Sequence, residues 1–146
     1  MTDPYILLVE DNRDDADLTV LAFRNNRIAN RIVVARDGAE ALDTLFGPGA
    51  QANELPELPA LVILDLNLPK VSGIEVLQRI RSTPRTALLP VVVLTTSVED
   101  DDVLNSYRNG CNAYVQKPVS FDEFQDATGK LALFWLPLNV RPPVGS

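Results

Sequence analysis

Residues 61–73 read LVILDLNLPKVSG, and this segment joins an apolar run to a polar loop and the start of a helix. Four consecutive apolar residues, 61–64, are typical of a strand buried on both faces of a parallel sheet. Asp65 follows them directly, where an unpaired carboxylate would be costly. Asn67 and Pro69 indicate a loop, and residues 73–82 have the apolar spacing of a helix. The segment predicts a strand–loop–helix unit with an acid at the carboxyl end of its strand.

The same unit recurs along the chain. We expect further strands over 5–9, 31–35, 91–94 and 114–116, and further helices over 13–26, 39–46, 99–109 and 120–135. In the first helix, Leu18, Leu21 and Ala22 have helical spacing and predict its apolar face. Strands alternating with helices predict a doubly wound α/β sandwich around a parallel sheet. In such sheets the functional site lies beyond the carboxyl ends of the strands.

Connections and caps fit this outline. Asn12 is a candidate N-cap for the first helix, and acids after it suit the positive end of the helix dipole. Ser97 with Asp100, and Ser120 with Glu123, have the spacing of capping boxes. The segment 47–59 is polar, contains Gly and Pro, and predicts a surface loop.

Length and composition limit the possible functions. A chain of 146 residues predicts one domain, placed at 1–135, with a proline-containing tail over 136–146. The net charge of −7 argues against nucleic-acid binding, which needs a basic face. No apolar run approaches the roughly 18 residues of a membrane span, and neither a signal peptide nor a cysteine pair is evident, so we expect a cytoplasmic protein. The chain has no histidine, which excludes a Ser-His triad.

Polar side chains follow four of the five predicted strands. Glu10 and Asp11 follow the first, Asp65 the third, Thr95 the fourth and Lys117 the fifth. In a parallel sheet these residues converge on one edge. Three carboxylates in one cleft repel each other unless a cation is present, and all-oxygen ligands beside a phosphate favour Mg²⁺. A carboxylate nucleophile, a metal, a lysine and a hydroxyl are what phosphoryl transfer to a carboxylate needs.

The strings LLVEDN, LVILDLNLPKVSG, LPVVVLTTS and GCNAYVQKPV resemble the four signature blocks of bacterial response-regulator receiver domains. The resemblance covers roughly residues 4 to 135 and implies a flavodoxin-like (βα)5 fold with strand order 2-1-3-4-5. It implies that Asp65 is the phosphoacceptor of a phosphorelay switch, not a conventional enzyme, which assists its own phosphorylation and dephosphorylation. It also implies a Mg²⁺ site with Asp11 as a direct ligand, Glu10 acting through water, and the backbone carbonyl of Asn67 as a third protein ligand.

The other signature residues take their expected roles from the same resemblance. Thr95 resembles the switch hydroxyl that binds the phosphoryl group, and Tyr114 the aromatic that moves inward with it. Lys117 resembles the lysine that pairs with the phosphoryl oxygens, and the bond to Pro118 would be cis. Thr96 departs from the small residue usual after the switch threonine, so the rates of phosphoryl gain and loss are open.

More closely, the chain resembles stand-alone receivers that pair with bacterial and cyanobacterial phytochrome kinases. The segment PVVVLTTS, the loop after the second helix and the ending Phe134-Trp135-Leu136 support this. A sensor histidine kinase of phytochrome type is then the expected partner, and output is expected to pass through contact with another protein. We also expect a homodimer through the face of the fourth helix, fifth strand and fifth helix and through the Phe134–Trp135 end, with a monomer as the alternative.

Three other functions are weaker. Phosphatases and mutases with an aspartyl-phosphate intermediate have the motif Asp-x-Asp-x-Thr at the nucleophile. Here Asn67 occupies the position of the second acid. A nucleotide-binding module would need a glycine-rich loop after the first strand, which the sequence lacks. A degenerate receiver acting as a scaffold is disfavoured because every expected site residue is present.

Overall fold

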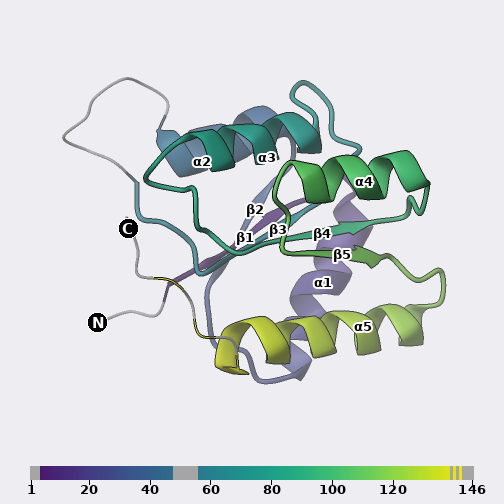
Figure 1. Cartoon of the computed structure of the whole chain (residues 1–146). Coiled ribbons are helices and arrows are strands. Elements are labelled where there is room, and N and C mark those ends of the chain that lie inside the picture. Colours follow the sequence, from purple (N-terminus) through teal and green to yellow (C-terminus); the bar gives the residue numbers. More distant parts are fainter. Residues whose placement is uncertain (1–3, 48–55, 139, 141, 143–146) are drawn as a thin grey trace.

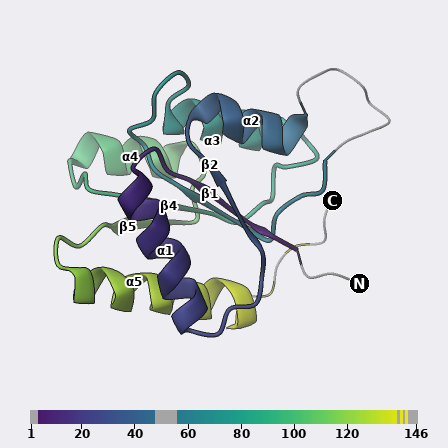
Figure 2. The same cartoon turned by 180° about the vertical axis from the view of Figure 1, so that it is seen from behind.

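A computed structural model describes residues 4–47, 56–138, 140 and 142. Five parallel strands form one sheet in the order β2-β1-β3-β4-β5: β1 (Ile6–Val9), β2 (Ile32–Ala35), β3 (Leu61–Leu64), β4 (Val91–Thr95) and β5 (Ala113–Gln116). The helices are α1 (Arg13–Asn25), α2 (Gly38–Phe46), α3 (Gly73–Ser82), α4 (Asp100–Arg108) and α5 (Phe121–Leu133). Helices α2, α3 and α4 lie on one side of the sheet, and α1 and α5 on the other (Figures 1 and 2). The predicted doubly wound fold and its strand order are confirmed.

Two apolar layers hold the sandwich together, one on each face of the sheet. Alternate strand residues such as Leu7, Val62 and Val93 pack under α2 and α3, and their neighbours, including Leu8 and Ile63, pack under α1 and α5. Strands β1, β3 and β4 are buried on both faces, which explains their uninterrupted apolar sequences. These three strands therefore supply a rigid base for whatever follows their carboxyl ends.

The buried face of α1 differs from the predicted one. Leu21 is 44% exposed, whereas Ala16, Thr19 and Phe23 are buried beside Ala22. Thr19 can be buried because its hydroxyl donates to a backbone carbonyl, that of Asp15, at 2.8 Å. A polar residue that satisfies itself locally thus takes a place that apolar spacing alone gave to leucine.

The structure confirms two of the three expected helix N-caps and contradicts the third. Asn12 caps α1, its side chain accepting from the N–H of Asp15 at 3.0 Å, and Ser120 caps α5 in the same way. The capping box of Ser97 with Asp100 is wrong. The N-cap position of α4 is Glu99, whose side chain makes no cap bond, and Ser97 lies two residues earlier.

The C-terminal end of α5 also differs from expectation. The α-helix ends at Leu133, and a π-helical turn, η1 (Phe134–Leu138), continues it into the predicted tail. Trp135 and Leu136 pack against the apolar layer under α1 and α5, whereas Phe134 is 50% exposed. Of the predicted loop 47–59, residues 48–55 lie outside the described residues, as do 139, 141 and 143–146 of the predicted tail.

Every peptide bond in the described residues is trans, including Lys117–Pro118, so the expected cis bond is wrong. The trans isomer is the intrinsically preferred one before proline. Within the described part of the chain, no helix has the length and apolar character needed to cross a membrane.

Candidate functional site

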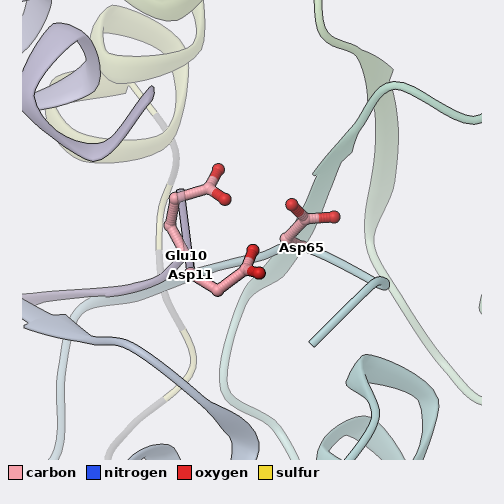
Figure 3. A group of neighbouring side chains, drawn as sticks. All are labelled: Glu10, Asp11 and Asp65. Atoms are coloured by element: carbon pink, nitrogen blue, oxygen red, sulfur yellow. The ribbon is translucent and has the colours of Figure 1, made fainter. Parts of the chain in front are cut away.

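The carboxyl ends of β1 and β3 bring three carboxylates together. Val9 and Leu64 are paired across these adjacent strands, and the N–H of Asp65 donates to the carbonyl of Val9 at 3.0 Å. Glu10, Asp11 and Asp65 therefore leave the sheet side by side and turn toward a common space (Figure 3). One oxygen from each lies within 4.8 Å of the others. Glu10 and Asp65 are buried, and Asp11 is exposed at the mouth.

Lys117 neutralises part of this charge from the end of β5. Its N–H donates to the carbonyl of Thr95 at 2.7 Å, which places it beside the end of β4. Its ammonium nitrogen Nζ lies 2.5 Å from Oε1 of Glu10 and 3.0 Å from Oδ2 of Asp65. The side chain is only 5% exposed, so the pairs are shielded from water. The aspartate at the centre of the site thus shares a buried cation with its acidic neighbour.

Burial and neighbouring charges have opposite effects on the pKa of Glu10 and on that of Lys117. Burial raises the pKa of the Glu10 carboxyl to about 7, although Lys117 and the N–H of Asn12 both favour the anion. Burial lowers the pKa of Lys117, but the hydrogen bond to Glu10 and the charge of Asp65 outweigh it and leave that pKa above its ordinary value. Lys117 therefore stays charged, and one ammonium does not fully compensate the acids around it.

The predicted switch residues lie on β4 and β5. Thr95 is fully buried, and its hydroxyl has no hydrogen-bond partner among the described residues. A buried hydroxyl without a partner costs about 1–3 kcal/mol, so a ligand that accepts from it gains accordingly. The Tyr114 hydroxyl donates to the carbonyl of Ser97 at 2.9 Å, and the Ser97 hydroxyl donates to Asp102 of α4 at 2.5 Å. This chain of bonds links β5 to the start of α4.

The donor set fits a hard divalent cation. All three clustered side chains offer carboxylate oxygens, the ligands that Mg²⁺ prefers, and Lys117 shows that the cluster accepts positive charge. Asn67 lies two residues after Asp65, and its N–H donates to Oδ1 of Asp65 at 3.3 Å. The role of its carbonyl as a metal ligand remains a prediction.

Comparison with known proteins identifies the family of the chain. The family model "Response regulator receiver domain" matches residues 6–128. The chain belongs to the response regulator receiver family. The receiver is 43% identical over 143 residues to "Probable methanogenesis regulatory protein FilR2" of Methanothrix harundinacea, covering 96% of this chain and 89% of that one. It is 38% identical over 137 residues to "Response regulator Rcp1" of Synechocystis, covering 94% and 92%.

Solved structures agree with these relatives. The phosphorylated cyanobacterial phytochrome response regulator RcpA superposes on this receiver with a TM-score of 0.88 at 38% identity, over 97% of this chain and 100% of that one. The Mn²⁺-bound form of Rcp1 superposes with a TM-score of 0.86 at 36% identity, over 96% and 99%. A receiver similar to this one therefore binds a divalent metal.

One glycine of the receiver fixes the loop that carries Asp65. A Cβ on Gly73, the first residue of α3, would lie 2.3 Å from the carbonyl oxygen of Asp65. The N–H of Gly73 also donates to the carbonyl of Leu66 at 3.0 Å. The close approach of α3 to the loop thus depends on the absence of a side chain at this position.

Asp15 was not predicted to belong to the site. Its Oδ2 lies 3.0 Å from the Lys117 Nζ, yet in the sequence it appeared only as an acid favoured by the dipole of α1. The available signal was its position one helical turn beyond Asp11, on the helix that starts at the end of β1. A partner 102 residues away cannot be found from such local spacing.

Proposed function

We propose that Asp65 accepts a phosphoryl group from the phosphohistidine of a sensor histidine kinase and that this changes the surface through which the receiver signals. One observation carries the proposal: the Asp65 carboxylate lies at the buried end of a central strand, between a lysine and an acidic pair. Membership of the receiver family supports it. Buried, charge-paired carboxylates at the switch point of a doubly wound sheet are poised for chemistry rather than for stability.

The transfer needs one oxygen of Asp65 to attack phosphorus. The new P–O bond forms as the P–N bond to histidine breaks, and the electron pair returns to the imidazole. Asp11, Asp65, the Asn67 carbonyl and, through water, Glu10 would hold Mg²⁺, which would neutralise charge on the phosphoryl oxygens. Lys117 is within 3.0 Å of Oδ2 of Asp65, and so is close enough to pair with a phosphoryl oxygen on it.

Loss of the phosphoryl group is a second transfer, in which water is the nucleophile and the Asp65 carboxylate is the leaving group. Water attacks phosphorus, the P–O bond to Asp65 breaks, and inorganic phosphate leaves with the carboxylate restored. The same residues assist both reactions, because they stabilise the charge that develops on the phosphoryl oxygens in each transition state. Thr96 lies beside the switch threonine and is exposed, so it is in a position to affect the approach of water.

Thr95 and Tyr114 connect this chemistry to the surface. The unpartnered hydroxyl of Thr95 is suited to donate to a phosphoryl oxygen. Movement of Thr95 would alter the connection between β4 and α4, where Tyr114 is bonded to Ser97. We propose that the face formed by α4, β5 and α5 is the output surface.

A phytochrome-type kinase is the proposed donor, because the cyanobacterial phytochrome response regulator RcpA matches this receiver over nearly its whole length. The test is transfer of label from autophosphorylated kinases to the receiver. A phytochrome kinase should transfer to Asp65 much faster than histidine kinases of other classes. Equal transfer from all of them would contradict this partner while leaving the receiver function intact.

Treatment with a small phosphodonor and Mg²⁺ tests the phosphoacceptor itself. Intact mass should increase by one phosphoryl group in the wild type and in Asp14→Asn, a control for an exposed acid of α1. Asp65→Asn should fold, because the amide is isosteric and removes a repelling charge, but should gain no mass. A wild type that takes up no phosphoryl group would refute the proposal.

We further propose a homodimer on the same face. Exposed apolar side chains lie on α4 and at both ends of α5, continuing into η1: Leu104, Tyr107, Phe121, Leu133 and Phe134. Trp135 packs against the receiver's own apolar layer, so Phe134 is the aromatic available to a partner at this end. Exposed aromatic residues beside aliphatic ones are typical of a protein–protein interface.

A further inference from the structure

Lys117 has a third carboxylate partner that lies outside the candidate metal cluster. Asp15 approaches from the first turn of α1, with its Oδ2 3.0 Å from Nζ and its side chain 29% exposed. Among the described residues, the acidic cluster suited to a metal contains Glu10, Asp11 and Asp65 but not Asp15. Asp15 therefore interacts with the site through the lysine.

The position of Asp15 is well defined. Its N–H is bound by the Asn12 cap at 3.0 Å, and its carbonyl accepts from the Thr19 hydroxyl at 2.8 Å. The Lys117 ammonium has three N–H donors, and three carboxylates surround it: those of Glu10, Asp15 and Asp65. Each donor can thus be matched with one acid.

The three partners of Lys117 change differently during phosphorylation. A cation bound to the acidic cluster competes with the ammonium for oxygens of Glu10 and Asp65. Phosphorylation converts the Asp65 carboxylate into an acyl phosphate. Asp15 lies outside the acidic cluster and is not the carboxylate proposed to be modified, so Lys117 can keep it as a partner throughout.

We propose that Asp15 is a positioning residue: it holds the Lys117 ammonium toward α1, offsets its charge, and so raises the affinity of the acidic cluster for Mg²⁺. The inference rests on the proposed function of Asp65. Without Asp15, the lysine would pair more completely with Glu10 and Asp65 and compete more strongly with the metal. The loss of the negative charge of Asp15 would also weaken Mg²⁺ binding, so both effects lower the affinity.

Calorimetric titration of the purified receiver with Mg²⁺ tests the proposal. Asp15→Asn should bind Mg²⁺ about tenfold more weakly, as expected for a residue that orients a group in the site. Asp14→Asn removes the same charge from the same helical turn. The Asp14 side chain makes no polar contact among the described residues, so the Mg²⁺ affinity of this variant should stay within about twofold of the wild type. Asp15→Glu keeps the carboxylate and should recover much of the affinity.

Two companion measurements separate the possible failures. Melting curves show whether each variant is folded, and intact mass with a phosphodonor at saturating Mg²⁺ shows whether Asp65 is still modified. Asp15→Asn should remain folded and accept the phosphoryl group. Equal weakening by Asp15→Asn and Asp14→Asn, or no weakening by either, would overturn the role of Asp15. Absence of labelling in the wild type would instead refute the function of Asp65.

Discussion

At the scale of single residues, the site is a balance between one buried ammonium and several acids. Lys117 is within 3.0 Å of Glu10, Asp15 and Asp65, and Asp11 adds a further carboxylate at the mouth. Opposite charges at such distances stabilise each other strongly when water is excluded. The carboxylates still outnumber the ammonium. The raised pKa of Glu10 comes mainly from its burial, and the charge of Asp65 adds a smaller contribution. The cluster is thus stable enough to form and charged enough to attract a cation.

We expect Glu10 to make Mg²⁺ binding depend on pH. Its pKa in the folded chain is about 7, above the ordinary value of 4.5, so the folded chain holds this proton more tightly than the unfolded chain. The corresponding stability is complete below the unfolded pKa and is lost as pH rises through the folded pKa. Mg²⁺ favours the anion, so its affinity should increase between about pH 6 and about pH 8.

Calorimetric titrations across this range measure the effect. Glu10→Gln has no proton to lose and should show weaker binding with a flatter pH dependence. Mg²⁺ should also raise the melting temperature of the wild type. At a free Mg²⁺ concentration 100 times the dissociation constant, the free energy of unfolding should increase by about 2.7 kcal/mol. A wild-type affinity that is constant over the range would show that Glu10 does not control the site.

At the scale of elements, α3 supports the loop that carries Asp65, and α4 is the element through which we propose that the signal passes. Gly73→Ala should lower the free energy of unfolding by about 1–3 kcal/mol, because the new methyl meets the backbone carbonyl of Asp65. Gly129→Ala is the matched control: its Cβ meets the end of the Asn26 side chain, which can move aside. Urea denaturation of both variants gives the comparison. A Gly73→Ala change no larger than that of Gly129→Ala would contradict the packing argument.

The connection between β4 and α4 should carry the signal. In the wild type, phosphorylation should change hydrogen exchange in α4 (Asp100–Arg108), because Thr95 moves toward the phosphoryl group and Tyr114 follows. Thr95→Ala should still be phosphorylated, but most of this change should disappear. Tyr114→Phe should speed exchange in α4 before phosphorylation, because it removes the bond to Ser97. A full response in Thr95→Ala would count against the coupling.

The elements also show where sequence is informative. Buried strands such as 61–64 are predictable because both faces of a parallel sheet need apolar residues. Glu10, Asp65 and Lys117 could be placed together because parallel strands end at one edge. The buried face of α1 could not be predicted, because the Thr19 hydroxyl finds a partner in its own helix and Leu21 stays exposed. Contacts such as Asp15 with Lys117 depend on how α1 lies across the sheet, which no local pattern contains.

At the scale of the whole molecule, the exposed apolar side chains on α4, α5 and η1 lead to the proposed dimer. The wild type should associate reversibly in sedimentation velocity, and Phe134→Ala with Leu133→Ala should raise the dissociation constant about tenfold or more. Leu88→Ala is the control, because Leu88 is 54% exposed but lies between α3 and β4. A wild type that stays monomeric at high concentration, with and without phosphodonor, would refute the dimer.

The proposed function of the whole molecule depends on one covalent bond, that between Asp65 and the phosphoryl group, and its location can be measured directly. Borohydride reduces an aspartyl phosphate to homoserine, so peptide mass spectrometry after phosphodonor, Mg²⁺ and borohydride identifies the modified aspartate. We expect homoserine at the position of Asp65 and at no other acid, and none in Asp65→Asn. Reduction at Asp11, Asp15 or another acid in place of Asp65 would contradict the account.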